Sequence, residues 1–376
     1  MDTPSPESWP PNPGAAGGPG GPGGPVPPPV PPRSSVPSVP SGLPASSGPG
    51  EPPPIPTAAG SGPREAILAL RDEVGKVVVG QEGTLSGLVA ALLVRGHVLL
   101  EGVPGVAKTL LVKTLAQALD LDFKRVQFTP DLMPSDVTGQ LVLDRTSEEG
   151  MRFREGPIFT NLFLADEINR TPPKTQSALL EAMEERQVTA EGAARLLPDP
   201  FVVIATENPV EHEGTYPLPE AQLDRFLFKL LVGYPSFEQE TEILARHHRG
   251  LDPHDIIGAG VRPVATASDL AAARSEVDMV DVQPTVQQYI VAICRATRES
   301  PSVELGVSPR GAASLLHAAK AWAWLSGRTF VTPDEIKAVA KPTLRHRLVV
   351  RPELELEGVS ADGLLDSILA TVPAPR

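Results

Sequence analysis

The chain has 376 residues, enough for two or three domains, and a formal net charge of −13. Nucleic-acid binding depends on clustered Lys and Arg that neutralise phosphates, so the acidic balance argues against a general nucleic-acid surface. The single cysteine, Cys294, excludes an intramolecular disulfide and fits a reducing compartment. Its neighbours are apolar, which favours a buried core thiol over a nucleophile.

Residues 1–63 consist mostly of Pro, Gly, Ser and Ala, with almost no periodic apolar pattern. Such a segment cannot bury enough apolar surface to offset its ordering entropy, so we predict a disordered tail. Residues 28–33 are typical of polyproline II sequences that dock on aromatic grooves, and a flexible tether is the alternative. We find neither a signal peptide nor the roughly 20 consecutive apolar residues of a membrane helix, and therefore expect a soluble cytoplasmic protein without direct membrane insertion.

Two helices are predicted after the tail, over residues 64–74 and 84–95. The apolar turn between them contains Val79 and Gly80. At this distance upstream of the next motif, the turn could cover an adenine ring, or it could serve packing alone.

The segment Gly-Val-Pro-Gly-Val-Ala-Lys-Thr at residues 102–109 lies between a predicted buried strand, 98–100, and a predicted helix, 110–119. Strand, glycine loop and helix form the context of a phosphate loop, whose backbone N–H groups surround a polyphosphate. Lys108 would meet the outer phosphates and Thr109 would ligate Mg²⁺. Ala107 replaces the glycine usual before the lysine; alanine adds only a methyl group and tolerates a helical φ. An ordinary strand-to-helix turn is the alternative. The predicted nucleotide-contacting residues are Val79, Gly80, Gly102, Pro104, Gly105, Val106, Ala107, Lys108, Thr109 and Leu110.

An acidic pair, Asp166 and Glu167, closes the apolar run 162–165. Parallel α/β sheets bind ligands at the carboxyl ends of their strands, where these acids would lie. We predict that Asp166 holds Mg²⁺, directly or through water. Glu167 would orient and polarise the water that attacks the γ-phosphate.

Three further residues follow in the order that a nucleotide site would need. Asn208 comes after the apolar strand 201–206 and could hold the attacking water, although Asn-Pro is also a common turn. Arg225 directly precedes the predicted strand 226–231 and is a candidate arginine finger. Arg310 follows a Ser-Pro cap in the first turn of a helix, which suits a terminal phosphate.

The remaining patterns predict two hairpins, within residues 129–158 and 186–197. The first has a charged exposed tip at residues 147–150 and is either a solvated hairpin or a substrate-contacting pore loop. From residue 235 the pattern becomes helical, and the pair His247-His248 lacks further ligands at metal spacing. The predicted helices span residues 237–249, 284–298, 309–324 and 333–340.

This order of motifs resembles an AAA+ ATPase, with Walker A at 102–109, Walker B at 162–167, sensor 1 at Asn208, the finger at Arg225 and sensor 2 at Arg310. More closely, the chain resembles the MoxR family, in which Ala107 is usual. The resemblance covers residue 64 to the C-terminus. The segments that carry it are 102–109, 165–170, 180–185 and 219–226.

The resemblance implies an α/β fold: an AAA+ doubly wound αβα core, a P-loop NTPase, over residues 64–234, and a small C-terminal helical lid over 235–376. It also implies ring assembly, usually as hexamers, and hydrolysis of ATP with Mg²⁺. The turnover would drive chaperone-like maturation of partner complexes, often von Willebrand factor A domain proteins.

A magnesium-chelatase-like motor and a nucleotide-gated binding scaffold with incidental hydrolysis are the alternatives. A DNA motor is disfavoured by the acidic balance. Measuring ATP turnover against protein concentration would distinguish the scaffold from a ring ATPase. For a scaffold, hydrolysis stays negligible at every concentration, while assembly still depends on ATP.

Overall fold

The computed structural model describes residues 52, 62–143, 151–190, 192–209 and 214–375, all within one compact unit that spans residues 46–376. The predicted polyproline segment, 28–33, and the charged hairpin tip, 147–150, lie outside the described residues.

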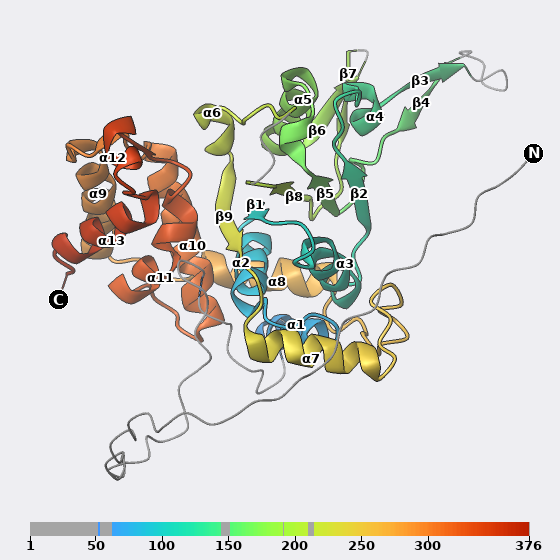
Figure 1. The fold of residues 1–376 in the computed structure, drawn as a ribbon, viewed down its shortest axis with the longest axis horizontal. Coiled ribbons are helices and arrows are strands. Elements are labelled where there is room, and N and C mark those ends of the chain that lie inside the picture. Colours follow the sequence, from blue (N-terminus) through green and yellow to red (C-terminus); the bar gives the residue numbers. More distant parts are fainter. Residues whose placement is uncertain (1–51, 53–61, 144–150, 191, 210–213, 376) are drawn as a thin grey trace, which may run out of the picture. The chain divides into compact units, whose positions relative to one another are not determined.

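The central sheet has five parallel strands in the order β2-β5-β8-β1-β9 (Figure 1). Four of them match the segments predicted as strands, 98–100, 162–165, 201–206 and 226–231. Because β1 and β5 both pair with β8, the carboxyl ends of these three strands are neighbours. The strands are β1 (His97–Gly102), β2 (Phe123–Gln127), β5 (Leu162–Asp166), β8 (Val202–Glu207) and β9 (Phe226–Val232).

The sheet is covered on both faces because its strands alternate between two hydrophobic clusters. In β1, Val98 and Leu100 join one cluster, while Leu99 joins the other. The first cluster includes side chains of α1 (Pro63–Gly75), α2 (Glu82–Leu93), α3 (Lys108–Ala118) and α8 (Ala267–Asp278). The second includes side chains of α5 (Pro173–Glu185). This arrangement confirms the doubly wound αβα core.

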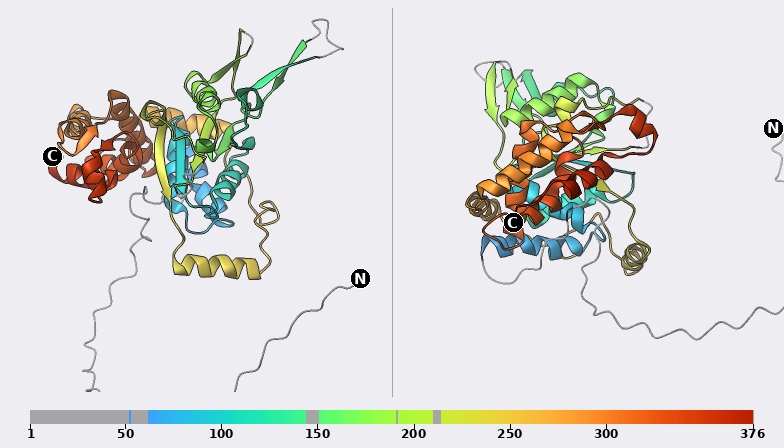
Figure 2. Two further views of the ribbon diagram at one scale, coloured as in Figure 1. Left: turned by 45° about the horizontal axis from the view of Figure 1, so that its top comes forward. Right: turned by 90° about the vertical axis from the view of Figure 1, so that its left-hand side faces the viewer.

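Two antiparallel hairpins, β3 (Gly139–Leu143) with β4 (Met151–Glu155) and β6 (Gln187–Ala190) with β7 (Ala193–Leu196), extend from the same side of the sheet (Figure 2). The guanidinium of Arg195 stacks over the ring of Phe153 at 4.0 Å, which joins the two hairpins. A turn at residues 130–131 leads into the short helix α4 (Pro134–Thr138), which was not predicted. It forms because Asp136 accepts a hydrogen bond from the Met133 N–H at 2.9 Å and caps the first turn.

The C-terminal part is helical, as predicted, and shares the first hydrophobic cluster with α1 and α2. Helix α11 runs four residues past its predicted end because Pro342 is buried inside it, so tertiary packing outweighs the usual helix-breaking effect of proline. The elements are α6 (Glu220–Leu223), α7 (Phe237–His248), α9 (Pro284–Glu299), β10 (Val303–Leu305), α10 (Pro309–Leu325), α11 (Pro333–Leu344), β11 (Val349–Val350), α12 (Pro352–Leu356) and α13 (Ala361–Thr371).

Helix α8 was not predicted, since its alanines give a weak apolar periodicity, and it contacts α1, α2 and α10. A boundary at residue 234 between core and lid therefore stays a prediction. Cys294 is buried, as expected, and burial raises the pKa of its thiol to about 11. Among the residues that the structure describes, no helix has the length and apolar character needed to cross a membrane. Within the same ranges, no three His, Cys, Asp or Glu side chains cluster as metal ligands.

His97, at the start of β1, joins three elements of the core. Its Nδ1 accepts a hydrogen bond from the Val203 N–H of β8 at 3.0 Å, so the proton must reside on Nε2, which faces the Met183 carbonyl of α5 at 3.1 Å. Both ring nitrogens are satisfied only in this neutral form. Burial therefore lowers the pKa of His97 from 6.5 to about 4.

This depressed pKa predicts that acid destabilises the fold. Below pH 6.5 His97 becomes protonated in the unfolded chain, whereas in the folded protein it stays neutral until about pH 4. The free energy of unfolding therefore decreases as the pH falls from 6.5 to 4. Between pH 7 and 5 we expect His97 to remove about 2 kcal/mol from the free energy of unfolding. Denaturant titrations at the two pH values measure this loss.

The matched variant is His97→Gln, whose amide offers a donor and an acceptor but does not titrate. We expect the difference in unfolding free energy between pH 7 and 5 to shrink by about the same amount. An unchanged difference would exclude His97 as the source of the pH dependence.

Candidate nucleotide-binding site

The carboxyl ends of β2, β5 and β8 and the loop that follows β1 border a cavity of about 700 Å³. Residues 104–110 form one wall of it, and Asp166, Glu167 and Asn208 form another. Gly102 ends β1 just before this loop, and its carbonyl accepts a hydrogen bond from the Lys108 ammonium. The structure thus brings the predicted phosphate loop, acidic pair and Asn208 to a single site.

Ala107 does not adopt the helical φ that alanine tolerates. It has φ 62° and ψ 22°, in the left-handed region, at the N-cap of α3. The loop has to reverse here so that Lys108 and Thr109 start the helix facing the cavity. A Cβ in this region costs roughly 1–2 kcal/mol, which explains why glycine is the common residue in phosphate loops.

Lys108 and Asp166 face the same cavity with opposite charges. Burial lowers the pKa of the Lys108 ammonium, and the nearby carboxylates of Asp166 and Glu167 oppose that shift. The Thr109 hydroxyl lies 3.5 Å from the Asp166 carboxylate. A hydroxyl and a carboxylate at this spacing supply the hard oxygen ligands that Mg²⁺ prefers, and Lys108 supplies a cation for a phosphate.

Asp166 is 8% exposed, and neighbouring side chains hold its carboxylate. Its Oδ1 accepts a hydrogen bond from the Thr206 hydroxyl at 2.5 Å, and its Oδ2 accepts one from Arg125 Nε at 2.8 Å. These bonds fix the direction of the carboxylate and offset the cost of burying its charge.

Glu167 has a left-handed backbone, with φ 56° and ψ 52°. Its N–H donates to the Thr206 hydroxyl at 2.8 Å. Its Oε2 accepts a hydrogen bond from Gln127 at 2.7 Å and pairs with Arg170 Nε at 2.9 Å. Strain of this kind costs of order 1–3 kcal/mol and persists only where the surroundings impose it. Here the surroundings aim a carboxylate at the phosphate-loop cavity.

Sequence reasoning missed Arg125, Gln127 and Thr206, all of which line the cavity. A signal was present, since Arg125 and Gln127 alternate along β2, whose last residue pairs with Asp166 in the parallel register. Side chains two residues apart on a strand share a face. Finding them, however, required knowing that β2 is the neighbour of β5.

The two arginines lie elsewhere in the protomer. Arg225 and Arg310 line a different cavity, of about 220 Å³, whose other lining residues include Glu184. The Glu184 carboxylate pairs with Arg225 Nε at 3.1 Å and accepts bonds from Arg310 NH2 at 2.7 and 2.8 Å. These ion pairs lower the pKa of Glu184, with the Arg310 hydrogen bond as the largest cause. Neither arginine is among the residues that line the cavity of Lys108 and Asp166 in the same chain.

Val79 and Gly80 also lie outside the lining of the phosphate-loop cavity. Their neighbours Val78 and Gln81 line a cavity of about 300 Å³ that reaches Leu111 of α3. Gly80 has φ 78°, and a Cβ there would meet the Gln239 side chain of α7 at 2.5 Å, so glycine is required at this turn. A contact of Val79 and Gly80 with the base stays a prediction.

A parallel αβα sheet, a phosphate loop that opens a helix, and acids at the end of a neighbouring strand define a P-loop nucleoside-triphosphate-binding protein. The comparisons agree with this class. The family model described as "ATPase family associated with various cellular activities (AAA)" matches residues 97–228, and the AAA lid domain model matches residues 295–368. The solved structure of a Cytophaga hutchinsonii protein assigned as an ATPase has a TM-score of 0.76 and 42% identity, covering 84% of this chain and 96% of the other.

Two relatives match most of the chain, and the name of the second identifies the family. The uncharacterized protein YeaC of Bacillus subtilis is 50% identical over 81% of this chain and 93% of its own length. Chaperone MoxR1 of Mycobacterium tuberculosis is 42% identical over 81% of both chains. The chain therefore belongs to the MoxR family of AAA+ ATPases, as its motifs indicated.

The left-handed conformation of Ala107 predicts that Ala107→Gly stabilises the protein by about 1 kcal/mol, since glycine adopts this φ without steric cost. Gly105, at φ 84° with open space around it, is the opposite control, and Gly105→Ala should destabilise by a similar amount. Thermal unfolding of both variants measures the effect. A lower melting temperature for Ala107→Gly would contradict the strained conformation.

Proposed function

We propose that the chain hydrolyses ATP as a ring of identical subunits and couples turnover to the remodelling or maturation of a partner protein complex. Membership of an AAA ATPase family supports the hydrolysis. The observation that carries the ring is the separation of the two cavities. One holds Lys108, Asp166 and Glu167, and the other holds Arg225 and Arg310.

Within one protomer, Lys108 would neutralise the outer phosphates, and Glu167 with Asn208 would orient the attacking water. Asp166 and Thr109 would hold Mg²⁺, which when bound neutralises phosphate charge and aligns the phosphates. The hydrogen bonds from Arg125 and Thr206 keep the Asp166 carboxylate directed toward the cavity. The other lysine and arginine that line this cavity have partners of their own, Arg125 the Asp166 carboxylate at 2.8 Å and Lys113 the His254 carbonyl at 3.4 Å, so a further cation would be needed to stabilise charge on the transferred phosphoryl group.

A neighbouring subunit would supply that cation. An arginine finger contributes about 10³ to 10⁵ to the rate, or roughly 4–7 kcal/mol of barrier. Arg225 and Arg310 are 31% and 47% exposed at their side chains, so both are accessible to an adjacent protomer. An isolated subunit should therefore turn over slowly.

The two hairpins support a role in contacting the partner protein. Each hairpin exposes a large apolar side chain, Leu143 at 81% and Leu196 at 79%. We propose that these side chains contribute to an apolar contact with the partner, since contiguous exposed apolar patches mark interaction surfaces. The family resemblance implies that the partner is a von Willebrand factor A domain protein. We also propose that the ring is a hexamer and that the protein is cytoplasmic.

Replacing Glu167 tests the hydrolytic role. For Glu167→Gln we expect nucleotide affinity to persist, because the phosphate loop is intact, and turnover to fall by about 10²- to 10⁴-fold through loss of the base. Phosphate release and nucleotide titration measure the two quantities. The control is Glu181→Gln on the exposed face of α5, which should leave both unchanged. Wild-type turnover in Glu167→Gln would remove this residue from the chemistry.

Mixed assemblies test whether Arg225 acts on a neighbour. Arg225→Ala alone should lose turnover by about 10³-fold or more. Adding inactive Lys108→Ala subunits, which still carry Arg225, should restore turnover, since each variant lacks a different half of the shared site. Phosphate release against mixing ratio is the measurement. An absence of restoration at every ratio would contradict action in trans and the ring mechanism built on it.

A further inference from the structure

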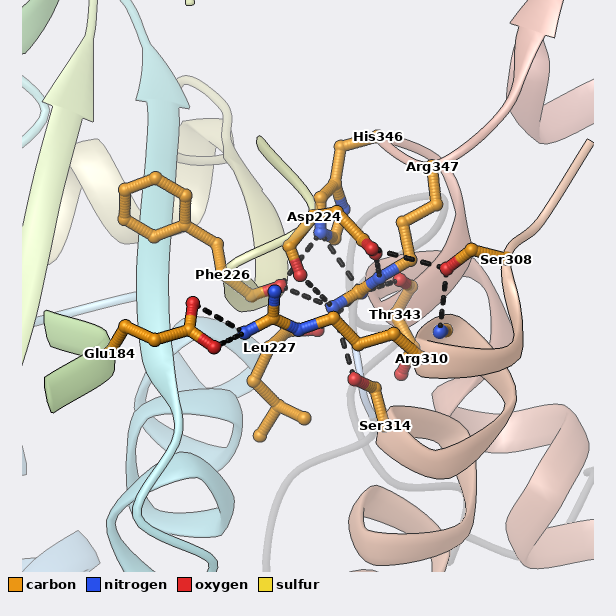
Figure 3. A network of polar contacts seen from close by, with 11 residues as sticks. Glu184, Asp224, Phe226, Leu227, Ser308, Arg310, Ser314, Thr343, His346 and Arg347 are labelled. Atoms are coloured by element: carbon orange, nitrogen blue, oxygen red, sulfur yellow. Dashed lines mark hydrogen bonds and ion pairs between the residues drawn. The ribbon is translucent and has the colours of Figure 1, made fainter. Parts of the chain in front are cut away.

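Arg347 lies just after α11, and its side chain is only 1% exposed. Figure 3 shows its guanidinium between the C-terminal helices and the segment that leads into β9. Burying a guanidinium is costly unless it is paired and fully hydrogen-bonded. Burial does lower the pKa of Arg347, and the Asp224 carboxylate opposes the shift. The contacts that compensate this charge converge on a short part of the chain.

Those contacts fasten the backbone on both sides of Arg225. Arg347 Nε donates to the Asp224 carboxylate at 2.7 Å, and NH2 donates to the carbonyls of Asp224 at 3.1 Å and Phe226 at 2.6 Å. NH1 donates to the carbonyl of Leu227 at 3.1 Å. The residue before Arg225 and the two residues after it are therefore bound to one planar, rigid group.

The same network holds the first turns of α10, which carry Arg310. Arg347 NH2 donates to the Ser314 hydroxyl at 3.1 Å. The Ser308 hydroxyl, which caps α10, donates to the other oxygen of Asp224 at 3.1 Å. The stem of Arg347 also packs against Gly311, where an added Cβ would meet its Cδ at 2.9 Å.

The tips of the two arginines are joined as well, since Glu184 pairs with both. Figure 3 shows its contact with Arg310. Arg225 and Arg310, which are 85 positions apart in the sequence, are thus fixed at their bases by Arg347 with Asp224 and at their tips by Glu184. An ion pair that served stability alone would not need to include both Arg225 and Arg310. These are the two residues that, in the proposed function, contact the nucleotide of the neighbouring subunit.

We propose that Arg347 is a positioning residue that holds Arg225 and Arg310 as one rigid pair, oriented for the nucleotide of the adjacent protomer. This inference rests on the proposed function, in which those arginines act in trans. A misplacement of about 1 Å in a catalytic group can lower the rate about 10²-fold, so the rigidity of this support sets the rate that the pair can reach.

The test is Arg347→Lys in the full chain. Lysine keeps the charge and can reach one acceptor. It lacks the planar guanidinium whose several N–H groups donate to the backbone carbonyls and to Ser314 at the same time. We expect kcat to fall tenfold to a hundredfold, while the affinity of the variant's own cavity for a nucleotide analogue stays at the wild-type value. A role in folding alone would not separate these two quantities.

Arg345→Lys is the matched control. Arg345 is also buried near the end of α11, with 4% of its side chain exposed, but it pairs with Asp362 at 3.0 Å. The Arg345→Lys variant should lower thermal stability about as much as Arg347→Lys does and leave kcat unchanged. An equal loss of kcat in both variants, or full kcat in Arg347→Lys, would overturn the proposal.

Mixed assemblies then locate the defect. Lys108→Ala subunits, which carry an intact Arg347, should restore turnover to Arg347→Lys subunits, whereas the double variant Lys108→Ala with Arg347→Lys should not. If Arg347→Lys does not fold, Asp224→Asn replaces it in the same mixtures, because it removes the charge that orients the guanidinium. Restoration by the double variant would overturn the proposal.

The Arg225→Ala mixtures separate the two levels of failure. If Lys108→Ala subunits fail to rescue Arg225→Ala, action in trans is wrong and both proposals fall. If they rescue Arg225→Ala and the double variant rescues equally well, only the role of Arg347 is overturned.

Discussion

A buried negative charge at the end of β5 organises the nucleotide site. Asp166 is 8% exposed, and such a carboxylate is tolerated only where donors surround it. Thr206 from β8, Arg125 from β2 and Thr109 from α3 all lie within hydrogen-bonding range of its oxygens. Because these groups come from three different elements, satisfying one carboxylate also fixes how the phosphate loop faces the acidic strand. The strained backbone of Glu167 follows, since its N–H binds the same Thr206 hydroxyl.

A second buried charge, the guanidinium of Arg347, organises the region of Arg225 and Arg310 in the same way, beginning with its hydrogen bond to the Asp224 carboxylate. One buried anion thus orders the side that binds nucleotide, and one buried cation orders the side that carries Arg225 and Arg310. The two regions meet through His97, which links β8 at Val203 to the Met183 carbonyl of α5. The next residue of α5, Glu184, holds both arginines. The strand that ends beside Asn208 and the arginine pair are therefore connected through the hydrogen bonds of His97 and the ion pairs of Glu184.

Two local conformations were decided by tertiary structure against local preference. Ala107 takes a left-handed φ because the phosphate loop has to close onto α3, although an isolated alanine would avoid it. Pro342 lies inside α11 because the surrounding helices bury it, although proline disfavours a helix interior. In both cases the gain from placing neighbouring groups exceeds a local cost of a few kcal/mol.

The αβα class was implied by the resemblance of the motifs to AAA+ ATPases. The sequence by itself determined the order of the sheet-forming segments along the chain and the roles expected of Lys108, Thr109, Asp166, Glu167 and Asn208. These follow from apolar runs and from polar residues at strand ends, which are local signals. Only the tertiary structure decided which strands are neighbours, and therefore that Arg125, Gln127 and Thr206 belong to the site. It also decided that Arg225 and Arg310 share Glu184 and lie apart from the phosphate loop of their own chain. The physical reason is that these contacts join residues far apart in the sequence, and no local pattern encodes a pairing that forms only when the sheet and the helices pack.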